Sequence, residues 1–109
     1  MAVPAHQMIE IIQELASPDP RIRESAADRM TDWLGNYSPG DGKTLAGLLS
    51  LAAACEQDHV ALEAELNALL ALGTRGYTDL STLQRLRDIE VETLPPELQE
   101  YVEDLLSVN

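Results

Sequence analysis

Apolar residues recur at helical spacing along most of the chain. Near the N-terminus they follow the i, i+3, i+4, i+7 spacing of one helix face, with Met8, Ile11, Ile12 and Leu15. The same pattern predicts six helices, over about 5–16, 20–34, 43–56, 58–72, 80–89 and 96–106. No period-2 alternation is long enough to predict a strand. The sequence therefore predicts an all-α fold.

The clearest helix boundary lies in the stretch 17–30, SPDPRIRESAADRM. Pro18 disfavours helix in the residue before it, so the first helix is expected to end there. Asp19 suits the N-cap of the next helix, and Pro20 suits its first position. The row expected to face inward on this second helix is Ile22, Ala26, Met30 and either Trp33 or Leu34.

The longest irregular connection is expected at 35–42, GNYSPGDG, which holds three glycines and a proline. We expect it to be the mobile connection of the chain. Residues 40–44, GDGKT, look like the end of a phosphate-binding loop. However, Tyr37 occupies the position of the first glycine, and no strand precedes it. The pattern therefore favours a plain loop followed by a helix start.

The helix pairs repeat at an interval of about 38 residues. This shift superposes three apolar sets of the second helices: Ile22–Val60–Leu98, Ala26–Ala64–Val102 and Met30–Ala68–Leu106. The three units span about 4–36, 41–73 and 78–107 of a single domain of 109 residues. The middle unit ends in a helix that is apolar over much of its circumference, which predicts a central, buried position. Three antiparallel pairs in series predict a short α-solenoid, with a plain five- or six-helix bundle as the alternative.

The stretch 17–30 resembles the turn and second helix of a HEAT repeat, where aspartate precedes a β-branched residue, arginine and alanine. The matching residues are Asp19, Ile22, Arg23 and Ala26. The resemblance implies that the aspartate ties down the turn and that the arginine pairs along the stack. It covers most of the chain in spacing but only one unit in polar signature, because Ala61 and Gln99 stand at the arginine position in the others.

The charge balance restricts the partners. Nineteen Asp and Glu face seven Lys and Arg, a formal net charge of −12. Nucleic acid and anionic membranes are held through basic residues, so we expect neither as a partner. A basic protein surface is favoured, although the same charge can serve solubility alone. No signal peptide or membrane span is visible, and we expect a cytoplasmic chain that is monomeric when alone.

No group of side chains in the sequence suggests chemistry. His6 and His59 lie in no metal-ligand spacing, and Cys55 has no cysteine or histidine partner three residues on. Cys55 is expected to be a small buried hydrophobe, and as a single cysteine it cannot form an internal disulfide. No nucleophile and base are paired in a recognisable pattern. We therefore expect no enzyme, no cofactor and no metal site.

Acidic side chains form rows on the predicted second helices. Glu24, Asp28 and Asp32 stand at i, i+4 and i+8, where like charges cost stability. From residue 88 onward the chain has seven acids and no base. In a HEAT-like stack the second helices line the concave surface, so the resemblance puts these rows on one face. The expected partner-binding set is Glu24, Asp28, Asp32, Glu63, Asn67, Glu97, Glu100, Tyr101 and Asp104.

Aromatic residues are the expected anchors of such an interface, because they dominate binding hot spots. The candidates are Trp33, Tyr37, Tyr77 and Tyr101. The pattern leaves open whether Trp33 belongs to the core or to the interface.

Small acidic chains of this kind resemble the immunity proteins that neutralise a toxin. The resemblance implies an inhibitor that occupies the basic cleft of its partner, such as a nuclease, with an acidic concave surface and associates rapidly through electrostatic steering. The alternative is a HEAT-like scaffold or adaptor module that joins proteins without inhibiting them.

Overall fold

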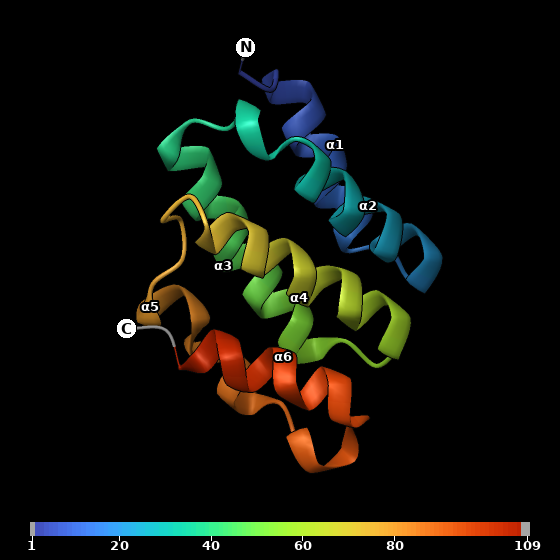
Figure 1. Cartoon of the computed structure of the whole chain (residues 1–109). Coiled ribbons are helices and arrows are strands. Elements are labelled where there is room, and N and C mark those ends of the chain that lie inside the picture. Colours follow the sequence, from blue (N-terminus) through green and yellow to red (C-terminus); the bar gives the residue numbers. More distant parts are fainter. Residues whose placement is uncertain (1, 108–109) are drawn as a thin grey trace.

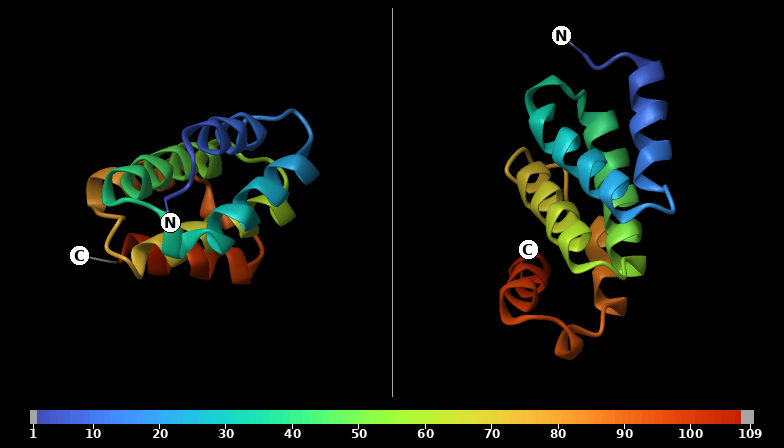
Figure 2. Two further views of the ribbon diagram at one scale, coloured as in Figure 1. Left: turned by 90° about the horizontal axis from the view of Figure 1, so that it is seen from above. Right: turned by 90° about the vertical axis from the view of Figure 1, so that its right-hand side faces the viewer.

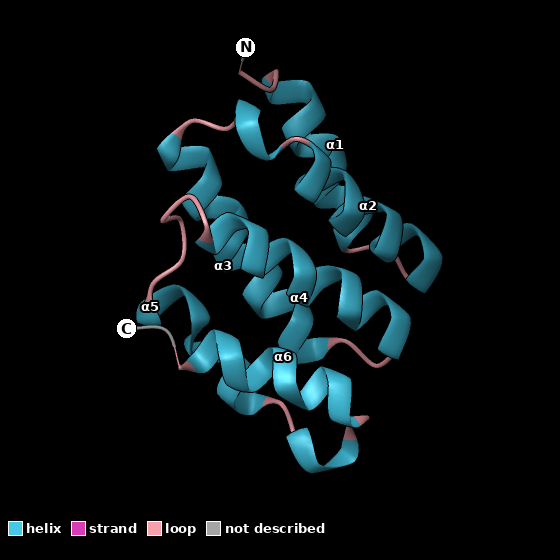
Figure 3. Cartoon of the chain, in the orientation of Figure 1, coloured by secondary structure: helices cyan, strands magenta, loops and turns pink. Residues whose placement is uncertain are grey.

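The computed structural model describes residues 2–107, and every regular element in this range is helical (Figure 3). In chain order the elements are α1 (Ala5–Leu15), α2 (Pro20–Asp32), the 3-10 turn η1 (Leu34–Asn36), α3 (Pro39–Cys55), α4 (His59–Gly73), α5 (Leu80–Leu83), the 3-10 segments η2 (Gln84–Asp88) and η3 (Val91–Thr93), and α6 (Pro96–Leu106). The all-α prediction is confirmed.

The helices form two layers (Figures 1 and 2). One layer holds α2, α4 and α6, and the other holds α1, α3 and α5 with η2. Short connections join α1 to α2 and α3 to α4, so each of these pairs is antiparallel. Three repeated pairs would give this layering, and so would a plain bundle, so the solenoid stays a prediction.

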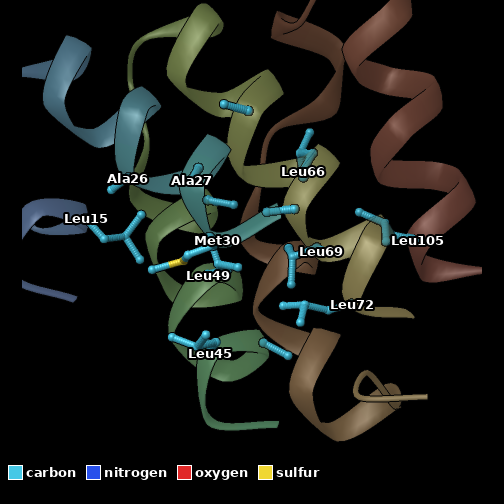
Figure 4. Close-up of a cluster of buried hydrophobic side chains, with 14 of the residues drawn as sticks. Leu15, Ala26, Ala27, Met30, Leu45, Leu49, Leu66, Leu69, Leu72 and Leu105 are labelled. Atoms are coloured by element: carbon cyan, nitrogen blue, oxygen red, sulfur yellow. The ribbon is translucent and has the colours of Figure 1, made fainter. Parts of the chain in front are cut away.

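The core is built mainly from leucine and alanine and is centred on α4. This helix packs against α2, α3 and α6 and buries eight of its side chains, in agreement with the prediction for the segment 58–72. Figure 4 shows Met30 of α2 lying with Leu15 and Leu49 on one side of the cluster. A helix that is apolar nearly all round needs neighbours on several sides, and the two layers supply them.

The predicted cap of α2 is confirmed, and α4 begins with a cap of the same kind. The Asp19 carboxylate accepts a hydrogen bond from the Arg21 amide at 2.9 Å, and Pro20 takes the first helical position. The Asp58 carboxylate accepts one from the Ala61 amide at 2.8 Å. Each cap satisfies an amide that the helix itself leaves without an acceptor.

The expected irregular loop at 35–42 is wrong, because α3 already begins at Pro39. The Ser38 hydroxyl caps this helix by accepting from the Asp41 amide at 3.2 Å. Residues 40–44 therefore lie within a helix and do not form a phosphate-binding loop. The serine–proline pair is an N-terminal helix signal of the same kind as Asp19–Pro20, and it was outweighed by the glycines.

Tyr37 and Tyr77 support this connection from inside, which corrects their expected role as exposed anchors. Tyr37 is 7% exposed and donates a hydrogen bond to the Met30 carbonyl at 2.8 Å. Burial raises the pKa of its phenol. Tyr77 is half-buried, and a Cβ on Gly42 would lie 2.3 Å from its ring carbon Cδ2. Glycine is therefore required at position 42 for the Tyr77 ring to pack on α3.

The expected continuous helix over 80–89 is also wrong. Asp79 and Thr82 form a capping box that starts α5, but after Leu83 the chain continues as 3-10 helix. Leu83 and Leu86 are fully buried three residues apart. A 3-10 helix has three residues per turn, so an i, i+3, i+6 row without an i+4 member fits it better than an α-helix.

Two residues of the superposed apolar sets on α2 and α4 point outward. Ile22 is 40% exposed and Val60 is 49% exposed, whereas Ala26 and Met30 are buried as predicted. Both exceptions lie in the first turn of their helices. At the start of α2 the part-buried position is taken by Arg23 instead, because its guanidinium bonds to Glu56.

Candidate functional site

A shallow depression, here called the acidic hollow, lies on the layer formed by α2, α4 and α6. Its volume is about 170 Å³, and its lining is formed by Glu24, Asp28, Val60, Glu63, Ala64, Asn67 and Tyr101. Five residues of the expected partner-binding set are thus brought together from three helices. The hollow combines carboxylates and an amide at its rim with the small apolar surfaces of Val60 and Ala64.

The walls of the hollow follow from helix spacing and close packing. Glu24 and Asp28 are one helical turn apart on α2, and Glu63 and Asn67 are one turn apart on α4, so each pair shares a face. The helices α2 and α4 lie side by side (Figure 1). Each helix therefore contributes a row, and packing brings the two rows to opposite sides of one depression.

Tyr101 closes the hollow from α6. It is half-buried, and its hydroxyl donates a hydrogen bond to Asn67 Oδ1 at 3.4 Å. Its ring packs against the core, so the aromatic face is held in place at the rim. Of the four aromatic anchors expected from the sequence, Tyr101 is the one in the hollow.

The other expected site residues lie outside the hollow. Asp32 is exposed at the end of α2, and Glu97, Glu100 and Asp104 are exposed on α6. Trp33 is half-buried and packs against the core next to the end of α2. Of the two roles that the sequence left open, core or interface, it therefore has the core role. The expected set therefore divides into a converging group of five, three acidic residues on α6, and Asp32 by itself at the end of α2.

Few cations offset the charge of the hollow. Arg21 Nη1 lies 2.7 Å from Glu24 Oε1, but half of the Arg21 side chain is exposed, so this pair contributes little stability. Among residues 2–107, neither Asp28 nor Glu63 takes part in an ion pair. The hollow is therefore strongly negative and would attract a cationic group.

A second polar group, which the sequence did not predict in full, joins α2 to the end of α3. Arg23 donates to both carboxylate oxygens of Glu56, at 2.8 Å and 2.7 Å, and to the Ser17 carbonyl at 2.8 Å. The Glu56 side chain is 1% exposed. Burial alone would raise the pKa of Glu56, but hydrogen bonds, chiefly from Arg23, lower it to about 2. This is the kind of contact along the stack that the resemblance implied for Arg23.

An apolar groove of about 520 Å³ lies on the other layer, between α1 and α3. Its walls are mainly Ile12, Leu15, Leu48, Leu51, Ala52 and Cys55. Cys55 is exposed there, so the expectation that it is buried is wrong. The groove exists because α1 makes few contacts with α3, whereas α3 packs closely on α5 and η2.

Within residues 2–107, no group of three or more His, Cys, Asp or Glu side chains is arranged to hold a metal ion. No helix in that range combines the length and apolar character needed to cross a bilayer. Comparison of the chain with family models, with curated proteins and with solved structures finds no match. The functional proposal therefore rests on the geometry of the surface.

Proposed function

We propose that this chain is a HEAT-like immunity protein of the cytoplasm that binds and inhibits a toxin with a basic cleft, such as a nuclease. The single observation that carries the proposal is the convergence of Glu24, Asp28 and Glu63 from two helices on one hollow. Carboxylates arranged in this way complement lysine and arginine side chains that would otherwise hold a substrate phosphate.

The composition of the hollow suits a basic side chain in two further respects. The Asn67 amide oxygen adds an acceptor for an N–H donor, and the Tyr101 ring offers a flat face on which a guanidinium can stack. The net charge of −12 accelerates the encounter with a positive partner, since steering depends on the field of the whole molecule. Inhibition then follows from occupation of the partner's cleft.

The test begins with affinity capture of the partner from the source cell, followed by an assay of its activity with and without this chain. Association rates are then measured at several salt concentrations for the triple variant Glu24→Gln, Asp28→Asn, Glu63→Gln. We expect association to slow at least tenfold and its salt dependence to become weaker.

A matched control is the triple variant Glu10→Gln, Glu90→Gln, Glu92→Gln. It removes the same number of charges from exposed positions outside the hollow. If both triple variants slow association equally, net charge alone drives binding and the hollow is not the site. If the partner keeps full activity in the complex, inhibition is wrong.

The apolar groove between α1 and α3 favours the alternative function, a scaffold or adaptor. Apolar grooves between helices accept amphipathic helical segments. Leu51 lines this groove and is 47% exposed. If the chain is a scaffold, Leu51→Asp should abolish partner binding, whereas the triple variant Glu24→Gln, Asp28→Asn, Glu63→Gln should still bind. The bound partner should keep its activity. The opposite pattern supports the inhibitor.

A further inference from the structure

Glu65 of α4 is an acidic side chain in the core. It has 0% exposure, and neither of its carboxylate oxygens has a hydrogen-bond partner within the described residues. A buried polar group without a partner costs free energy, and an ionised one costs considerably more. Glu65 is therefore a position where the fold accepts a cost that an apolar residue would avoid.

The charged groups around Glu65 come from the elements packed against it. Arg23 comes from α2, Glu56 follows the end of α3, and Asp58 lies in the turn before α4. The three guanidinium nitrogens of Arg23 already donate hydrogen bonds, two to Glu56 and one to the Ser17 carbonyl. Glu65 is thus near the Arg23–Glu56 ion pair, in which Glu56 already neutralises the arginine, and near the carboxylate of Asp58.

These surroundings favour the neutral form of Glu65. Burial is the main cause, the neighbouring Glu56 carboxylate adds to it, and Arg23 opposes it only in part; together they raise the pKa of Glu65 to about 9. A neutral carboxyl has an O–H that it can donate, whereas two neighbouring carboxylates would repel each other.

We propose that Glu65, Glu56 and Arg23 form a proton-dependent clasp that joins α2, the end of α3 and α4. With the proton in place, one guanidinium, one carboxylate and one neutral carboxyl share a buried site without excess charge. Loss of the proton leaves two buried carboxylates for one guanidinium and loosens the junction. Because α2 and α4 also carry the two walls of the acidic hollow, the clasp sets the spacing of those walls.

The direction of the pH effect follows from the two states of the chain. In the unfolded chain Glu65 loses its proton near its ordinary pKa of 4.5, whereas the folded chain keeps it up to about 9. Between these values the unfolded state binds fewer protons, so a rise in pH favours unfolding. For this single group the unfolding equilibrium constant rises by up to about tenfold for each pH unit.

The first test compares wild type with Glu65→Gln by denaturant unfolding between pH 5 and pH 8. Glutamine keeps the shape and the donor of the neutral acid but cannot ionise. We expect the ratio of the wild-type to the variant unfolding constant to grow with pH, by at least threefold for each unit. The control Glu10→Gln removes an exposed carboxyl of α1. Its unfolding constant should depend on pH in the same way as that of wild type. A ratio that does not vary with pH would overturn the clasp.

The second test uses wild type alone, so it does not depend on folding of the variant. Carbon NMR of the side-chain carboxyls should show Glu65 with the chemical shift of a neutral carboxyl throughout pH 3 to pH 7, whereas Glu56 should keep the shift of a carboxylate over most of this range. Above pH 8, amide exchange should accelerate in α2 and α4 beyond its intrinsic pH dependence and more than in α6. Titration of Glu65 in the ordinary range, or equal acceleration in the three helices, contradicts the proposal.

Discussion

The two junctions between successive helix pairs differ in kind. Where the first pair meets the second, the part-buried Arg23–Glu56 ion pair and the buried Glu65 lie beside the contact between α2 and α4. Where the second meets the third, α6 contributes buried Leu98, Val102 and Leu105. A 3.4 Å hydrogen bond from the Tyr101 hydroxyl to Asn67 Oδ1 also joins α6 to α4 at this second junction.

The difference follows Arg23, the arginine on which the resemblance to a HEAT repeat rests. Arg23 is present in the first unit, and the corresponding positions hold Ala61 and Gln99. A bidentate ion pair fixes geometry but returns little net stability, because desolvation offsets the attraction. Apolar side chains contribute stability that does not depend on charge. The first junction should therefore respond to pH and the second should not.

The largest effect should come from Arg23→Ala. It leaves Glu56 buried without its cation, which is expected to destabilise the chain by about 3–5 kcal/mol. Urea unfolding at pH 7 measures the change. Arg21→Ala is the matched control, because Arg21 lies two residues away on α2 and pairs with Glu24 and Asp58 at the surface. Its expected cost is below about 1 kcal/mol. Equal costs would show that the first junction does not depend on the buried pair.

The next effect is acid destabilisation through Glu56. Its folded pKa is about 2, against 4.5 for the ordinary group, so its contribution is present above pH 4.5 and is lost as the pH falls toward 2. The loss is on the order of 3 kcal/mol. Unfolding free energies between pH 5 and pH 2 check it. The variant Glu56→Gln should flatten this part of the profile, and an unchanged acid limb in that variant would assign the effect to other carboxylates.

The smallest effect should come from Tyr101→Phe at the second junction. The bond to Asn67 is long and exposed, so its loss should cost less than about 1 kcal/mol. The cost should be the same at pH 5 and pH 8, in contrast to changes at the first junction. A large or pH-dependent cost, measured by thermal unfolding, would remove the distinction between the junctions.

Local signals predicted much of the helical framework. Asp19 and Asp58 act as caps because a cap is a contact within one turn, which the sequence displays directly. Around the start of α3, Gly35, Gly40 and Gly42 favour a loop, and they hide the helix start that Ser38 and Pro39 signal. The packing of Tyr77 on Gly42, which explains one of those glycines, joins residues 35 positions apart and has no local signature.

The candidate site was predicted in its rows but not in its convergence. Spacing identified Glu24 with Asp28, and the repeat placed Glu63 and Asn67 on an equivalent helix. The spacing could not show that α6 brings Tyr101 to the same hollow while Glu97 and Glu100 lie outside it. That outcome depends on the rotation of each helix about its axis, which is set by packing against neighbours from distant parts of the chain.

By itself, the sequence determined most of the helix-forming segments, the cap of α2, the central position of α4 and the excess of negative charge. These are local or summed properties, fixed by the spacing of apolar residues and by composition. The tertiary structure alone decided that Ile22 turns outward while Arg23 turns inward, and that Glu65 lies without a partner in the core. Burial removes water from a side chain, and only the packed neighbours decide whether its charge is paired, neutralised or left exposed.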